Sequence, residues 1–299
     1  MKLATTTTDF VAYADSQQKS LELLRQAGFR YADYNFGIDY ARKNGVYQQD
    51  YLVYLDDVRR TADCMGIQLV QAHSPLGRPI APNNRQFLLD TARCVEACGI
   101  MGISNLVVHS GYDVNLTVEE TFEKNKQFFL PLLELGDRYH VNILVENFNK
   151  MEIENIWWID NALDLLAMVK YVDHPRFHAV WDAGHGNMQE MSQDEALRIL
   201  GKHVYALHIQ DNLGDADSHL MPFYGSLNFD SLMHGLIDIG YDGYFTFESS
   251  SMLNRNKKRF YSDDTRLKNP SLDVKMAEER LLYEIGKNVL TAYDCFEEE

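Results

Sequence analysis

The stretch VWDAGHGNM, residues 180–188, carries an apolar run directly into an aspartate and a histidine. Asp182 follows the apolar run, and His185 comes three positions later in a turn that contains two glycines. Alone, such a pattern is typical of a turn as much as of a binding site. The same design, an apolar run that ends in a His, Asp or Glu, recurs along the chain, and its recurrence predicts the fold.

Eight β-rich runs alternate with eight amphipathic helical stretches. The β-rich runs cover residues 3–10, 31–36, 67–73, 104–110, 141–147, 177–183, 204–210 and 244–249. The helical patterns cover roughly residues 16–27, 48–65, 84–101, 118–139, 160–171, 193–201, 229–240 and 273–294. Because the runs are almost continuously apolar, we expect both faces of each strand to be buried, as in a parallel sheet. Eight such units predict an α/β protein with a closed (β/α)8 TIM barrel.

The composition and the lack of linker-like segments predict a single domain over residues 1–299. No segment rich in Pro, Gly or Ser divides the chain, and the glycine-rich phosphate loops of open doubly wound sheets are absent from the sequence. The chain is 45% hydrophobic, with a mean hydropathy of −0.33 and no apolar run of about 18 residues, so we expect no membrane segment. Four cysteines without CxxC spacing indicate reduced thiols and a cytoplasmic protein.

The formal net charge is −16, which disfavours a polyanionic partner such as nucleic acid. One basic cluster, RNKKR at residues 255–259, falls in the polar segment 250–272. We expect this segment to form a loop at the mouth of the barrel.

Ligand-type residues gather at six consecutive predicted strand ends. In a (β/α)8 barrel, catalytic residues lie at the C-terminal ends of the strands. The residues at these ends are His73, His109, Glu146, Asp182, His185, His208, Asp217, His219 and Glu248. Burying so many ionisable groups at one mouth is costly unless a cation relieves it, so the pattern predicts a metal site.

Four of these residues make a plausible ligand set. Glu146, Asp182, His208 and Glu248 belong to the last four β-rich runs. Three carboxylates and one imidazole are a hard, oxygen-rich set that suits Mn²⁺, Mg²⁺ or Co²⁺, with Zn²⁺ also possible.

Seven stretches resemble the xylose-isomerase-like barrel superfamily, which holds sugar isomerases, sugar epimerases and endonuclease IV. They follow the family's order and are AHSPL (72–76), LVVHSG (106–111), ILVEN (143–147), VWDAGHGNM (180–188), ALHIQDN (206–212), DSHLMPFYGSLNF (217–229) and FTFES (245–249). The resemblance implies that Glu146, Asp182, His208 and Glu248 coordinate one divalent metal. It also implies that Glu146 and Glu248 form the acid/base pair and that His185 contacts substrate oxygens.

The expected chemistry is the isomerisation or epimerisation of a sugar or sugar phosphate through an enediolate. A metal makes the C–H beside a carbonyl acidic, and two carboxylates exchange the proton. Substrate contacts are expected from His73, His109, His185, Asp217, His219 and Asn147. Gly184 and Gly186 are expected to act as flexible joints that hold His185 over the mouth. The resemblance implies a homodimer or homotetramer.

Two alternatives stay open. Endonuclease IV uses a trinuclear zinc cluster, and all nine of its ligand types have counterparts here, although its ENTAG sequence is replaced by ENFNKMEIENIWW after Glu146. A barrel that binds its ligand without catalysis is the second alternative, and the complete ligand set speaks against it. Ketose 3-epimerases carry an arginine shortly after the strand-7 histidine, where this chain has Gly214.

Overall fold

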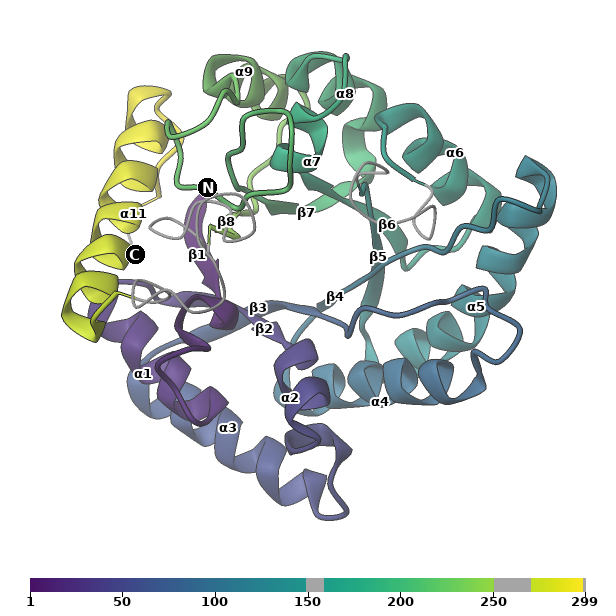
Figure 1. The fold of residues 1–299 in the computed structure, drawn as a ribbon, viewed down its shortest axis with the longest axis horizontal. Helices are drawn as coiled ribbons and strands as arrows, with labels where there is room; N and C mark the ends of the chain where they lie inside the picture. Colours follow the sequence, from purple (N-terminus) through teal and green to yellow (C-terminus); the bar gives the residue numbers. More distant parts are fainter. Residues whose placement is uncertain (149–158, 250–269, 298–299) are drawn as a thin grey trace, which may run out of the picture.

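Eight parallel strands form one ring with helices on its outside (Figure 1). The computed structural model describes residues 1–148, 159–249 and 270–297. The strands are β1 (Lys2–Thr6), β2 (Tyr31–Asn35), β3 (Gln68–His73), β4 (Asn105–Val108), β5 (Asn142–Glu146), β6 (Phe177–Asp182), β7 (Val204–His208) and β8 (Tyr244–Phe247). Each strand pairs in parallel with the next from β1 to β7, and β8 pairs with β1. The predicted (β/α)8 TIM barrel is confirmed.

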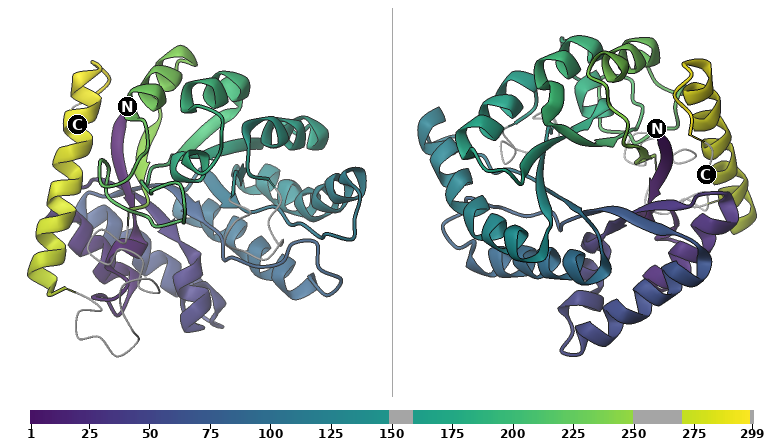
Figure 2. Two further views of the ribbon diagram at one scale, coloured as in Figure 1. Left: turned by 45° about the horizontal axis from the view of Figure 1, so that its top comes forward. Right: turned by 180° about the vertical axis from the view of Figure 1, so that it is seen from behind.

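The longer helices alternate with the strands and cover the outside of the ring, whereas two short helices follow β2 and β6 directly (Figure 2). The α-helices are α1 (Gln17–Ala27), α2 (Phe36–Arg42), α3 (Tyr51–Met65), α4 (Arg85–Met101), α5 (Val118–Tyr139), α6 (Ala162–Val172), α7 (Ala183–Asn187), α8 (Gln193–Leu200), α9 (Phe229–Asp238) and α11 (Leu272–Ala292). Short 3₁₀ turns are η1 (Thr7–Phe10), η2 (Gly45–Tyr47) and η3 (Gly201–His203). In the part of the chain that the structure describes, no helix is long and apolar enough to cross a membrane.

The ring closes between β7 and β8 at the level of two predicted ligands. Ile209 N donates a hydrogen bond to Thr246 O at 2.8 Å, and Glu248 N donates one to Ile209 O at 2.9 Å. Since Ile209 follows His208 directly, these closing bonds bring His208 and Glu248 to the same edge of the ring.

Alternation along the strands divides the barrel interior into layers. Val107, Leu144, Val180 and Ala206, from β4 to β7, form a buried apolar cluster separate from the larger core that packs beneath the helices. Successive side chains of a strand point to opposite faces, so residues two positions further on face the same interior. Those residues are His109, Glu146, Asp182 and His208, and they form a polar layer directly above the apolar one.

All the strands except β3 end one to four residues earlier than the predicted runs, and β1 and β2 show the reason. β1 ends at Thr6 because its hydroxyl caps the η1 turn by accepting a hydrogen bond from Thr8 N at 3.3 Å. β2 ends at Asn35, whose side chain accepts a hydrogen bond from Gly37 N at 2.8 Å and begins α2. The short helix α2 has no counterpart among the predicted helices, since seven residues carry too little periodicity to reveal it.

The two ends of the described chain meet beside β1. The Met1 ammonium donates to Cys295 O at 2.6 Å and pairs with Glu297 Oε1 at 3.0 Å. Helix α11 lies along the outside of the ring near β1 (Figure 2), where Tyr283 packs edge-on against Phe29 with ring centroids 5.2 Å apart. This contact fixes the last helix against the first strand–helix unit.

Helix α2 carries a buried carboxylate, Asp39, whose titration generates a stability prediction. Asp39 accepts hydrogen bonds from Tyr34 Oη at 2.9 Å, Tyr54 Oη at 3.1 Å and Gln17 Nε2 at 3.3 Å. Burial outweighs these bonds and raises the pKa of Asp39 to about 6. The folded state therefore binds more protons than the unfolded state between about pH 4 and 6, so the stability that Asp39 contributes is full below pH 4 and is lost as pH rises through 6.

We expect Asp39→Asn to remove this loss. The free energy of unfolding of the parent, relative to that of the variant, should fall by up to about 1.4 kcal/mol per pH unit between pH 4 and 6. Urea unfolding at several pH values measures the difference. A parent–variant difference that is constant with pH would refute the assignment.

Candidate metal centre

Four side chains converge at the mouth of the barrel. Glu146 ends β5, Asp182 ends β6, His208 ends β7, and Glu248 directly follows β8. One ligand atom from each lies within 4.8 Å of every other. The first three side chains are almost fully buried, whereas 16% of the Glu248 side chain is exposed. The structure thus brings together the four residues that were predicted as metal ligands.

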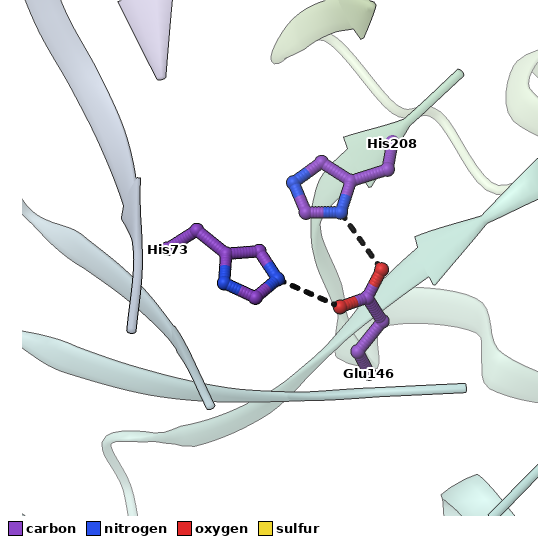
Figure 3. Close-up of side chains that lie close together, drawn as sticks. All are labelled: His73, Glu146 and His208. Carbon is purple, nitrogen blue, oxygen red and sulfur yellow. Dashed lines mark hydrogen bonds and ion pairs between the residues drawn. The ribbon is translucent and has the colours of Figure 1, made fainter. Parts of the chain in front are cut away.

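Glu146 lies at the centre of a group of histidines. Its Oε1 is 2.8 Å from His208 Nδ1, and its Oε2 is 3.4 Å from His73 Nε2 and 3.3 Å from His109 Nε2. Figure 3 shows the carboxylate between the His73 and His208 rings. Burial alone would raise the pKa of Glu146, but the nearby histidines hold it well below its usual range. Glu146 is therefore a buried anion.

Asp182 has two different oxygens. Its Oδ1 caps α7 by accepting a hydrogen bond from His185 N at 2.7 Å. Its Oδ2 is buried and accepts no hydrogen bond from the described residues. Burial raises the pKa of Asp182 to about 7. A buried oxygen without a donor, beside Glu146 and His208, is what a divalent cation would satisfy, so these residues fit a metal ion.

Asn147 braces the ends of β5 and β6. Its Oδ1 accepts a hydrogen bond from Asp182 N at 2.8 Å, and its Nδ2 donates one to Asp182 O at 2.9 Å. Both ends of the side chain are therefore used on the backbone of Asp182, and Asn147 is not among the residues that line the cavity described below. This geometry supports a bracing role for Asn147, and its contact with substrate stays a prediction.

A second cluster joins His185, Asp217 and His219. Asp217 Oδ2 lies 3.1 Å from His185 Nε2 and 3.3 Å from His219 Nε2. His219 Nδ1 lies 2.7 Å from Glu248 O, which ties this cluster to the end of β8. Burial alone would lower the pKa of His185, but Asp182 and Asp217 raise it to about 10. A third group is formed by His73 and His109, whose Nε2 atoms are 3.1 Å apart.

The prediction that Gly184 and Gly186 are flexible joints is wrong. Both are buried in α7. A Cβ on Gly184 would lie 2.1 Å from Gln210 Cδ, and one on Gly186 would lie 2.5 Å from the Trp181 ring. A side chain at Gly186 would collide with the Trp181 ring, and one at Gly184 would displace the buried amide of Gln210, so His185 lies on a closely packed turn.

A cavity of about 470 Å³ is lined by Glu146 and Glu248 of the four converging side chains, whereas Asp182 and His208 do not reach its lining. One wall contains the predicted residues His73, His109, Glu146, His185, Asp217, His219 and Glu248. The opposite wall comes from η1, α2 and the turn after β3, and its apolar members include Val11, Ile38, Tyr40 and Leu76. Among the described residues that line the cavity, none is a lysine or arginine. Most of the basic segment 250–272, which was predicted to lie at this mouth, falls outside the described residues.

Sequence reasoning missed three polar residues that support the site. Asp33 on β2 and Gln71 on β3 are buried beside His208, and Gln210 Nε2 donates to Asp217 Oδ1 at 2.6 Å. A signal existed for Gln71, which precedes His73 by two positions and so faces the same interior. Asp33 stands as a lone carboxylate within a β-rich run, which is itself unusual for a buried strand.

Comparison with known proteins identifies the family. A sequence model described as xylose isomerase-like TIM barrel matches residues 21–265. The chain belongs to this family. The sequence resemblance that rested on seven short stretches is thereby confirmed.

The chain is similar to several individual proteins in sequence or in structure. An uncharacterized protein of Methanocaldococcus jannaschii is 28% identical over 218 residues, which cover 69% of this chain and 71% of that protein. Fructoselysine 3-epimerase of Escherichia coli O157:H7 is 30% identical over 131 residues, which cover 44% of this chain and 46% of the enzyme. The solved structure of D-psicose 3-epimerase with D-tagatose from Clostridium cellulolyticum H10 has the same fold, with a TM-score of 0.73 at 15% identity over 97% of this chain and 99% of that one.

Replacing Asp182 with asparagine should separate metal binding from helix capping. Asparagine caps helices as well as aspartate does, so α7 should persist. We expect Asp182→Asn to weaken Mn²⁺ binding by more than about 100-fold, exceeding the loss typical of residues outside the ligand sphere. Isothermal titration calorimetry with Mn²⁺ measures the affinity, and thermal unfolding in EDTA should give a midpoint no lower than that of the parent.

The control is Asp39→Asn, which changes a buried carboxylate away from the site and should leave Mn²⁺ binding unchanged. Parent-like affinity in Asp182→Asn would remove Asp182 from the ligand set.

Proposed function

We propose that the protein is a metal-dependent sugar epimerase in which Glu146, Asp182, His208 and Glu248 hold one divalent ion. The observation that carries this proposal is the convergence of three carboxylates and one imidazole beneath a cavity of about 470 Å³. Membership of the xylose isomerase-like family supports it, as do relatives named fructoselysine 3-epimerase and D-psicose 3-epimerase.

A bound divalent ion of the Mn²⁺, Mg²⁺, Co²⁺ or Zn²⁺ type would polarise a substrate carbonyl and acidify the neighbouring C–H. The chain's own residues then handle the proton. Glu146 is held ionised by its histidine neighbours, so it is ready to accept a proton from carbon. Glu248, whose side chain is partly exposed, returns a proton to the same carbon from the opposite face of the enediolate. One proton is removed and one is returned, so the product is an epimer with unchanged composition.

Charge in the cavity favours a neutral sugar over a sugar phosphate. The described lining offers the imidazoles of His73, His109, His185 and His219, which can hydrogen-bond to hydroxyl groups, and no lysine or arginine. The charge of His185, whose pKa is raised to about 10, is already paired with Asp217 at 3.1 Å and Asp182 at 3.4 Å, so it is not free to bind a phosphate. The volume exceeds the need of a single pyranose ring, and the apolar wall opposite the carboxylates can accept a substituent on the sugar.

The acid/base assignment predicts the behaviour of two variants. Glu146→Gln and Glu248→Gln should each lower kcat by about 10²- to 10⁴-fold, since each loses one proton-transfer group. Exchange of carbon-bound hydrogen with deuterium oxide, followed by NMR over a panel of neutral ketoses and their phosphates, measures the reaction. The exposed control Glu123→Gln on α5 should exchange at the parent rate. Formation of the epimer at the parent rate in Glu248→Gln would show that another group returns the proton.

A second candidate, an endonuclease with a multinuclear zinc site, is favoured by the two clusters beside the central four residues. His73 and His109 approach Glu146, and Asp217 joins His185 to His219. These are the contacts that two further metal ions would replace.

Metal content decides between the candidates. We expect about one divalent ion per chain by mass spectrometry of the native protein, and no nicking of a DNA duplex that contains an abasic site. Three zinc ions per chain together with nicking would replace the epimerase proposal with the nuclease.

A further inference from the structure

One side of the barrel interior is polar where the rest is apolar. The layer beneath the metal centre is built by Val107, Leu144, Val180 and Ala206 on β4 to β7. On β2, β3 and β8 the buried residues near His208 are instead Asp33, Gln71 and Thr246. A carboxylate buried close to three others adds negative charge where it is already concentrated, which costs stability. Packing alone therefore does not explain why a carboxylate is buried at position 33.

The hydrogen bonds among these residues run from Thr246 through Gln71 to Asp33. Thr246 Oγ1 donates to Gln71 Oε1 at 3.2 Å, and Gln71 Nε2 donates to Asp33 Oδ2 at 2.7 Å. The opposite orientation of the Gln71 amide would set two oxygens against each other at that distance. Asp33 and Gln71 are also direct partners in the β2–β3 pairing, so the backbone holds them side by side.

The same carboxylate oxygen faces the imidazole of His208. Asp33 Oδ2 lies 3.0 Å from His208 Nε2. Asp33 Oδ2 already acts as an acceptor toward Gln71 Nε2, so the contact with His208 puts the hydrogen on Nε2, since otherwise two lone pairs would oppose each other. A neutral His208 then has its lone pair on Nδ1. That atom lies 2.8 Å from Glu146 Oε1 and 3.6 Å from Glu248 Oε2, within the proposed ligand set.

We propose that Asp33 is a positioning residue that fixes the ring orientation and tautomer of His208, so that Nδ1 is presented to the metal ion. Gln71 holds Asp33 in place, with Thr246 behind it. The inference rests on the metal site of the proposed function. It adds Asp33 on β2 and Gln71 on β3 as residues that support the ligand His208. A carboxylate that receives the second N–H of a ligating histidine orients the ring and strengthens the ligand.

Two substitutions at Asp33 test the proposal. Asp33→Asn keeps an acceptor oxygen without the charge, whereas Asp33→Leu removes the acceptor. In the leucine variant Gln71 Nε2, which lies 3.0 Å from His208 Nε2, can donate to that nitrogen and favour the tautomer with hydrogen on Nδ1. We expect Mn²⁺ affinity to fall in the order parent, Asp33→Asn, Asp33→Leu, with the leucine variant about 10- to 100-fold weaker than the parent.

A spectroscopic measurement separates positioning from a general effect on folding. In the Co²⁺-loaded parent, the proton on His208 Nε2 should give a strongly shifted, slowly exchanging NMR signal, which should be lost or exchange rapidly in Asp33→Leu. The control Asp39→Asn should keep both the parent Mn²⁺ affinity and this signal. Parent-like affinity and signal in Asp33→Leu would overturn the inference.

The measurements distinguish failure of the proposed function from failure of this inference. A parent that binds neither Mn²⁺ nor Co²⁺ would overturn the proposed function and this inference together, whereas tight binding that Asp33→Leu leaves intact would overturn the inference alone. If Asp33→Leu does not fold, two other variants test the inference. Gln71→Met alone must weaken Mn²⁺ binding. The double variant, Asp33→Asn with Gln71→Met, must bind Mn²⁺ as tightly as Asp33→Asn alone. Independent, additive losses would mean that Gln71 does not act through Asp33.

Discussion

The site depends on one buried anion, the carboxylate of Glu146. Its separation of 2.8 Å from His208 Nδ1, and of 3.3 to 3.4 Å from His109 and His73, places charge and imidazole together where water is excluded. Burying a carboxylate is expensive unless it is paired, and here its partners come from three different strands. These contacts can form only when β3, β4, β5 and β7 are held in one ring, so the site and the barrel require each other.

The alternation of side chains along the strands gives the barrel a layered interior. Residues two positions apart share a face, so an apolar layer on β4 to β7 lies under a polar layer that contains Glu146, Asp182 and His208. The turns above are closely packed. Asn147 holds the end of β6, Asp182 caps α7, and the glycines of α7 fit against neighbouring side chains. The apolar layer gives the ligand-type residues a fixed floor, and the capped turns give them a fixed rim.

The two walls of the cavity differ in their chemistry. Imidazoles and carboxylates line one wall of the cavity, while the opposite wall from η1, α2 and the turn after β3 is largely apolar. In the proposed function, the first wall presents the proton-transfer and metal-binding groups, and the second wall limits which molecule can approach them. Substrate choice can therefore change through residues such as Tyr40 and Leu76 without disturbing Glu146.

Local pattern by itself determined the eight strand–helix units and placed Glu146, Asp182, His208 and Glu248 at neighbouring strand ends, because periodicity and strand-end position are properties of short segments. It did not reveal α2, the close packing around Gly184, or the bracing by Asn147, which depend on neighbours that are distant in the chain. Asp33 shows the limit most clearly, since 175 positions separate it from His208. Only the closed ring brings the end of β7 near β2, and so only the tertiary structure decided that Nε2 of His208 faces Asp33 while Nδ1 faces Glu146 and Glu248.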